Sequence, residues 1–168
     1  MQQIESKIKW CLQKAEKEIA QGRKHRGLIK ITPDVQEAKK HLSKAEHNFK
    51  AVVVLEKAGL TDWSVSACFY TIYHCFLAII KKNGYESRNQ ECTIALVQQL
   101  KMQGLTKLDD SIINAFEPGQ QEEMHESSIL FLRENFQYGT ETIVEDKKLK
   151  ALKDTCKRVI EQAKQETY

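Results

Sequence analysis

An arginine in an apolar segment late in the chain is the residue best suited to do chemistry. Arg133 follows the apolar run ILFL at 129–132, and Asn135 stands two positions after it. A guanidinium group among apolar side chains needs an anionic partner, and its planar fork fits a carboxylate or a phosphate. Two interpretations stay open. Arg133 forms a structural ion pair with Glu134 or a glutamate of another helix, or it holds a phosphate with help from the Asn135 amide.

A histidine in the most apolar part of the sequence is the second candidate. His74 lies within the run FYTIYHCFLAII at 69–80, and Tyr70 precedes it by four positions. On a helix this spacing puts the two side chains on one face. His74 is either a core histidine bonded to a carbonyl or a tyrosine, or, with Tyr70, part of the lining of a polar groove.

Two further signals are weaker. The stretch QGRKHRGLIK at 21–30 is the densest basic patch and would attract phosphates. It lacks the interleaved aromatic residues of a base-stacking surface, so we interpret it as a solvated loop. The Glu-x-x-His motif formed by Glu122 and His125 occurs once, whereas di-iron bundles need it twice. We therefore predict neither a metal site nor a cofactor, and we find no Walker, GxGxxG or GxSxG motif.

The composition indicates one ordinary globular domain. The chain has 168 residues, 41% of them hydrophobic, and its net charge of +3 does not by itself indicate a nucleic-acid-binding protein. No apolar run approaches the ~20 residues of a membrane-spanning helix, and the N-terminus lacks the apolar stretch of a secretory signal. Five cysteines without CxxC spacing predict buried free thiols in a reducing compartment, so we expect a cytoplasmic protein. They are Cys11, Cys68, Cys75, Cys92 and Cys156.

Glycines divide the chain into helix-length segments, and only two prolines interrupt them. The pattern predicts helices at about 2–21, 34–58, 62–83, 90–103, 106–117, 120–138 and 142–166, with a linker at 23–33. The start signals are a capping sequence that begins at Thr32 and three capping boxes. These boxes are Ser87 with Gln90, Thr106 with Asp109, and Thr142 with Glu145. The helix at 62–83 is apolar nearly all round, which places it in the centre of a bundle or in a subunit interface.

Three segments, in this order, resemble the HEPN domains (higher eukaryotes and prokaryotes nucleotide-binding). Residues 63–96 resemble the second core helix of that family, with an aromatic pair at 69–70, then His74 and later Gly84. The preceding segment AKKHLSKAEHNFKAVVVLEKAG at 38–59 is similar to the first core helix. The segment SSILFLRENFQYG at 127–139 is similar to the helix that carries the signature arginine. The resemblance covers about residues 34–160 and is strongest to short archaeal and bacterial members.

The resemblance implies an all-α, up-and-down four- to five-helix bundle that dimerises. On this division residues 1–33 form an extra N-terminal helix and basic linker, and residues 34–168 form the HEPN-like bundle. Many such domains are metal-independent ribonucleases, often toxins paired with a nucleotidyltransferase antitoxin. In them an arginine is followed four to six residues later by a histidine, and the two copies of the motif meet across the dimer.

This chain departs from that motif at two positions. The arginine corresponds to Arg133, but the fifth residue after it is Tyr138. A tyrosine side chain, with a usual pKa near 10, is a poor general base at pH 7. Gln90 stands where close relatives often have a histidine. Whether the chain is an enzyme is therefore uncertain.

Our hypothesis is a homodimer that binds nucleotide or RNA in a groove around Arg133 and Tyr138, lined by Tyr70, His74 and Asn135. One alternative is a non-catalytic helical protein that docks a nucleotidyltransferase or another partner. The other is an active metal-independent ribonuclease in which Tyr138 or His125 replaces the missing base.

Overall fold

The chain folds into helices with one small sheet. The computed structural model describes residues 2–116 and 129–168, which contain seven helices and two three-residue strands. The all-α bundle that the sequence predicted is confirmed. In chain order the elements are α1 (Gln2–Ala20), β1 (Leu28–Lys30), α2 (Val35–Lys57), α3 (Thr61–Lys82), β2 (Tyr85–Ser87), α4 (Gln90–Met102), α5 (Asp110–Asn114), α7 (Ile129–Tyr138) and α8 (Asp146–Thr167).

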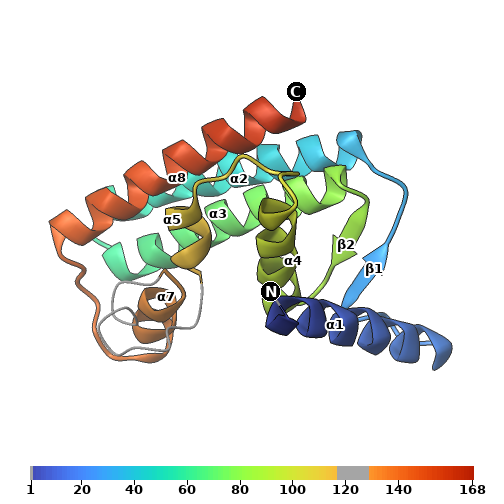
Figure 1. Cartoon of the computed structure of the whole chain (residues 1–168). Helices are drawn as coiled ribbons and strands as arrows, with labels where there is room; N and C mark the ends of the chain where they lie inside the picture. Colours follow the sequence, from blue (N-terminus) through green and yellow to red (C-terminus); the bar gives the residue numbers. More distant parts are fainter. Residues whose placement is uncertain (1, 117–128) are drawn as a thin grey trace.

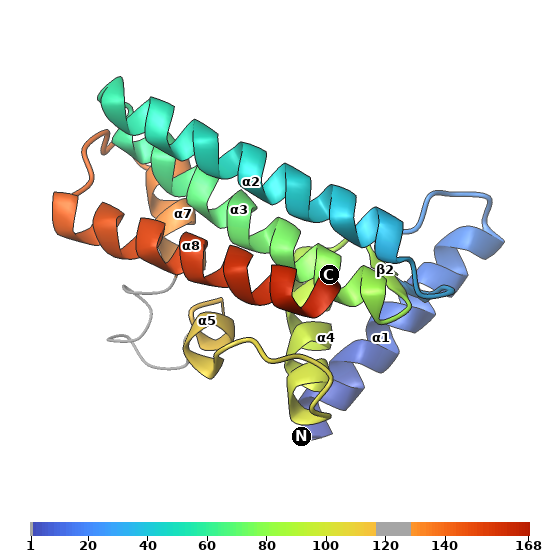
Figure 2. The same cartoon turned by 90° about the horizontal axis from the view of Figure 1, so that it is seen from above.

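Three long helices, α2, α3 and α8, lie side by side and form the body of the molecule (Figures 1 and 2). α3 is the central element: twelve of its residues are buried, and it contacts α2, α4, α7 and α8. Its apolar surface is nearly continuous, so burial on several sides is the stable arrangement. From the sequence we expected no apolar segment of membrane-spanning length, but among the described residues α3 is long and apolar enough to cross a membrane. Most of that stretch is buried inside this fold.

The helix ends follow the glycines, as predicted. Gly22, Gly59, Gly84 and Gly104 follow α1, α2, α3 and α4 and have positive φ angles. A residue with a Cβ atom is strained in this conformation, so glycine ends a helix there at low cost.

The predicted helix starts were less accurate. The cap of α2 is Asp34 rather than Thr32, because the Asp34 carboxylate accepts from the Glu37 amide at 2.9 Å. Asn89 rather than Ser87 caps α4, by accepting from the Cys92 amide at 3.0 Å. α8 begins after Glu145 rather than at Thr142.

The predicted helix at 106–117 is also shorter than expected. Thr106 caps no helix, because its hydroxyl donates to the Glu166 carboxylate at 2.9 Å, and α5 begins only at Asp110. The Glu166 carboxylate also accepts from the Lys107 amide at 2.7 Å, and the amide of Asp109 donates to Gln162 at 3.2 Å. The loop before α5 is therefore fastened to the last two turns of α8.

The linker predicted at 23–33 contains a strand. β1 pairs antiparallel with β2, with Leu28 opposite Ser87 and Lys30 opposite Tyr85. His25 in the basic stretch is only 6% exposed, and its Nε2 lies 3.2 Å from Glu86. The interpretation of the whole stretch as a solvated loop was wrong at these positions, because a three-residue ladder gives too short an alternation to be seen in the sequence.

Two of the five cysteines form a disulfide. Cys11 of α1 is bonded to Cys92 of α4, 81 positions later in the sequence, whereas Cys68, Cys75 and Cys156 are buried free thiols. The prediction of five free thiols was wrong for this pair. Sequence spacing does not show that α1 packs on α4, and only that packing brings the two sulfurs together.

Candidate functional site

The side chain of Arg133 lies between α7 and α3. Its guanidinium carbon is 4.4 Å from the centre of the Phe69 ring, and the side chain is 12% exposed. A guanidinium over an aromatic face is held by the negative charge density of the ring and by dispersion. α7 lies across the end of α3 nearest the start of α8, so the site is at one end of the bundle (Figure 1).

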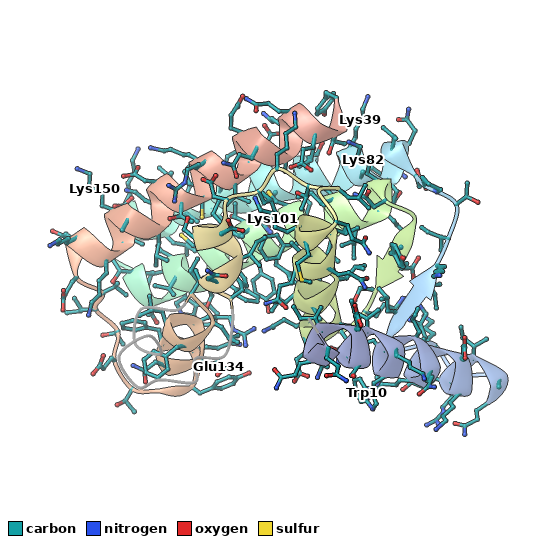
Figure 3. The ribbon with its side chains drawn as sticks, in the orientation of Figure 1. Trp10, Lys39, Lys82, Lys101, Glu134 and Lys150 are labelled. Atoms are coloured by element: carbon teal, nitrogen blue, oxygen red, sulfur yellow. A yellow bond between two sulfur atoms is a disulfide. The ribbon has the colours of Figure 1, made fainter. Side chains whose placement is uncertain are left out.

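Among the described residues, Arg133 donates two side-chain hydrogen bonds, and both are long. Its Nη1 donates to Gln90 Oε1 at 3.3 Å and its Nη2 to Glu134 Oε1 at 3.4 Å. Its buried Nε has no partner within the described part of the chain. Glu134 is about half exposed and lies on the side of the molecule away from α8 (Figure 3), so this pair is a weak surface ion pair. The guanidinium therefore keeps much of its capacity to bind an anion.

Gln90 is the first residue of α4, and sequence reasoning did not count it among the site residues. Its amide oxygen meets Arg133, although the two residues are 43 positions apart. The amino end of a helix carries partial positive charge, so α4 adds to the positive potential near the guanidinium. The signal that would have found it was its position in the HEPN-like segment, where close relatives often have a histidine.

The structure does not bring Tyr138 or Asn135 against Arg133 within one chain. Tyr138 is the last residue of α7 and is 76% exposed, and Asn135 is exposed as well. Five positions on an α-helix correspond to about 140° around its axis, so Arg133 faces α3 while Tyr138 points outward. In a single chain the Tyr138 hydroxyl is not placed to exchange a proton at a group bound by Arg133.

Tyr70 and His74 lie on α3, but neither contacts Arg133. The Tyr70 ring meets the edge of Phe69 at 5.3 Å and is 43% exposed. His74 turns toward α2, where its Nδ1 lies 3.1 Å from Nδ1 of His41. Burial, and to a smaller extent the nearby His41 and Lys44, lower the pKa of His74 to about 4. His74 is therefore a neutral imidazole at pH 7.

A row of exposed and partly buried side chains runs along α3 through Tyr70 and His74. Its five residues are spaced by four, three, four and three positions, so they form one stripe on the helix. We call this row the α3 stripe. Two of its aromatic rings are well exposed, on a helix that is otherwise largely buried. Its residues are Trp63, Ala67, Tyr70, His74 and Leu77.

Comparison with known protein families gives a match over most of the chain. The model of the HEPN domain matches residues 38–166. The chain belongs to the HEPN domain family. The match begins in α2 and ends in α8, so it includes α3, α4 and α7, which position Arg133, Phe69 and Gln90. No curated protein matches the chain.

Family membership accounts for the helical architecture and implies binding of a nucleotide or RNA. α1 and β1 lie before the matched segment. Among the described residues no group of three side chains is arranged to hold a metal ion. The Glu-x-x-His motif of Glu122 and His125 lies outside the described residues. The hypothesis that His125 serves as a base concerns the same undescribed segment.

Proposed function

We propose that this HEPN domain binds a nucleotide or RNA through a phosphate held by Arg133. The observation that carries the proposal is the state of the guanidinium. It is fixed on the Phe69 ring, yet its hydrogen bonds of 3.3 and 3.4 Å are longer than those of a well-formed charged pair. A phosphate has the charge and the oxygen spacing to replace the contact with Glu134, and the amide of Gln90 remains available to orient the guanidinium.

The functional unit in this proposal is a homodimer. The α3 stripe supplies aromatic and apolar surface next to Phe69, the ring on which Arg133 lies. A second copy that covers this stripe from Ala67 to Leu77 brings two Arg133 sites to one groove, and Tyr138 and Asn135 of one copy then line the site of the other. A toxin-type component paired with a nucleotidyltransferase fits this arrangement.

The same stripe supports a second candidate function. Exposed Trp63 and Tyr70 are residues enriched at protein interfaces, and a nucleotidyltransferase is a suitable partner for that surface. In this version the domain touches no RNA, and Arg133 only braces α7 against α3. The third possibility, an active ribonuclease, requires Tyr138 to act as the general base in place of an imidazole, and a phenol is a weaker match to that role at pH 7.

RNA titrations and melting curves of the same Arg133 variants distinguish a phosphate-binding arginine from one that only stabilises the packing of α7 on α3. If Arg133 holds a phosphate, Arg133→Lys weakens RNA binding severalfold, because an ammonium group lacks the planar fork. Arg133→Ala weakens it by about 1–3 kcal/mol, the value for a charged hydrogen bond. The melting temperature changes little, because the lost ion pair is a long one to Glu134, whose side chain is about half exposed.

Arg158→Ala is the matched control, because Arg158 is an arginine of α8 that is 52% exposed and lies 3.8 Å from Asp109. It should leave both the affinity and the stability of the protein nearly unchanged. A loss of about 3–5 kcal/mol of stability in Arg133→Ala, with no RNA or nucleotide binding in the wild type, would instead show a structural arginine and favour the interaction protein.

A further inference from the structure

A cavity lies one helical turn from Arg133, between the start of α3 and the end of α7. Its volume is about 350 Å³. Three residues of α3 form one wall, and the end of α7 with the loop that follows forms the other. The lining includes Asp62, Trp63, Ser66, Phe136, Gln137 and Glu141.

Helical spacing aligns this cavity with the guanidinium group. Gln137 is four positions after Arg133 on α7, and Ser66 is three positions before Phe69 on α3, so each pair shares one face of its helix. The displacement along both helices is about 5–6 Å. In a nucleotide one ribose separates the phosphate from the base, so the base of a nucleotide whose phosphate lies on Arg133 can reach this cavity.

Three polar side chains of the cavity lining make no hydrogen bond within the described residues. Ser66 is 8% exposed, and its hydroxyl makes no hydrogen bond with a described residue. The same holds for the Asp62 carboxylate and the Gln137 amide, which make neither a hydrogen bond nor an ion pair within residues 2–116 and 129–168. Trp63 is 58% exposed and offers a ring for stacking. Polar side chains that reach a hollow beside an exposed aromatic ring are the arrangement expected of a binding site.

We propose that this cavity binds a guanine base whose nucleotide phosphate lies on Arg133. The inference rests on the proposed function, since it needs the phosphate at Arg133. A carboxylate is an acceptor with two oxygens, and guanine alone among the four RNA bases presents two adjacent donors, N1–H and the N2 amino group, on its pairing edge. Adenine and cytosine present a donor beside an acceptor there. Asp62 on a helix is the reader of this edge, and Trp63 stacks on the base.

Glu141 is the second carboxylate of the lining, and it has to be separated from Asp62. It is exposed and lies in the loop between α7 and α8, whereas Asp62 is half-buried in the first turn of α3. A helical position holds a carboxylate in a more constant direction than a loop does. We therefore assign base selection to Asp62.

The test is titration of the full chain with GMP, AMP and ribose 5-phosphate. The chain has two tryptophans, so a Trp10→Phe background leaves Trp63 as the one reporter of stacking. The protein with Asp62 unchanged should bind GMP roughly tenfold more tightly than AMP, which is the discrimination expected of one bidentate contact. In Asp62→Asn this ratio should fall to about one while ribose 5-phosphate binds as before. Asp154→Asn, an exposed carboxylate of α8, is the control and should keep the ratio.

The outcomes separate the base site from the phosphate site. Equal binding of GMP, AMP and ribose 5-phosphate, all weakened by Arg133→Ala, would refute the guanine site and leave the proposed function standing. A GMP preference that survives in Asp62→Asn, or that is lost in Glu141→Gln instead, would refute the role of Asp62. If none of the three compounds binds at millimolar concentration, the phosphate site at Arg133 fails together with the base site.

Discussion

His41 and His74 form a pair of neutral imidazoles between α2 and α3. The two Nδ1 atoms are 3.1 Å apart, so one ring must donate a proton and the other must accept it. Burial lowers the pKa of both histidines, that of His74 to about 4. Protonation of either ring sets two donors against each other. The pair is therefore stable as long as both rings stay uncharged.

This pair predicts a loss of stability in weak acid. The unfolded chain binds a proton at His74 near pH 6.5, whereas the folded chain does so only near pH 4. The contribution is complete above pH 6.5 and is lost as the pH falls from 6.5 toward 4. We expect the melting temperature of the wild type to fall between pH 7 and 5, and that of His74→Gln to fall less.

His47→Gln, which removes an exposed histidine of α2, is the control and should follow the wild type. The pH range from 7 to 5 lies above the range in which Glu86 affects stability. The pKa of Glu86 is lowered to about 2, chiefly by its hydrogen bond to Lys81. The Glu86 contribution is lost only from about pH 4.5 down to pH 2. Identical pH slopes for wild type and His74→Gln would contradict the prediction.

At the scale of the elements, the sequence was most informative about the helices. Glycines at their ends and the apolar period of α2 are local signals, so they can be recognised without knowledge of the fold. The two short strands were missed because three residues carry too little pattern. The caps Asp34 and Asn89 were missed by two positions because several Ser, Thr, Asp and Asn residues compete near each start.

The candidate site was only partly predictable, because only part of it depends on local sequence signals. Arg133 was found because its own segment resembles a family segment. Its partners Phe69 and Gln90 belong to other helices, and their contacts depend on how α7 packs on α3 and α4. The orientation of His74 toward His41 likewise depends on the packing of two helices. Contacts between distant segments leave no local signal in a single sequence.

The disulfide between α1 and α4 predicts the number of free thiols and the effect of a reductant on stability. Without reductant, denatured protein should titrate three thiols, those of Cys68, Cys75 and Cys156, and after reduction five. The bond closes a loop of 81 positions, so chain entropy predicts a stabilisation of about 4 kcal/mol. We expect a reductant to lower the melting temperature by roughly 10 °C.

The double variant Cys11→Ser/Cys92→Ser serves as the control. It should melt near the temperature of the reduced wild type and should not respond to the reductant. Five reactive thiols in unreduced, denatured wild type would show that the bond is absent from the protein in solution.

At the scale of the whole molecule, the α3 stripe predicts a homodimer. Tyr70 is 43% exposed in the middle of the stripe, and a glutamate there would place a charge in a shared apolar surface. We expect the wild type to sediment as a dimer at micromolar concentration and Tyr70→Glu to sediment as a monomer. Circular dichroism should show that the variant keeps its helices, since Tyr70 faces solvent in one chain.

Trp10→Ala tests whether any exposed aromatic residue would do the same. Trp10 is 47% exposed on α1 and points away from the other helices (Figure 3), so its loss should leave the dimer intact. A wild-type protein that remains a monomer at micromolar concentration would remove the shared groove and with it the role of Tyr138 and Asn135 in the site.

The division into residues 1–33 and 34–168 stays a prediction at this scale. The family match begins at residue 38, and α1 is joined to the matched part by the disulfide and by the ion pair of Lys7 with Glu91. The β1–β2 ladder adds a third connection. Because of these links, we expect α1 to unfold together with the bundle.

The attachment of the loop before α5 to α8 has a consequence for hydrogen exchange. The amides of Lys107 and Asp109 belong to no helix or strand, yet they donate to side chains of the last two turns of α8. An amide that is bonded in this way exchanges with deuterium only when the bond opens. Protection at these two loop positions therefore reports the fraying of a helix at residues 59 and 53 positions further along the chain.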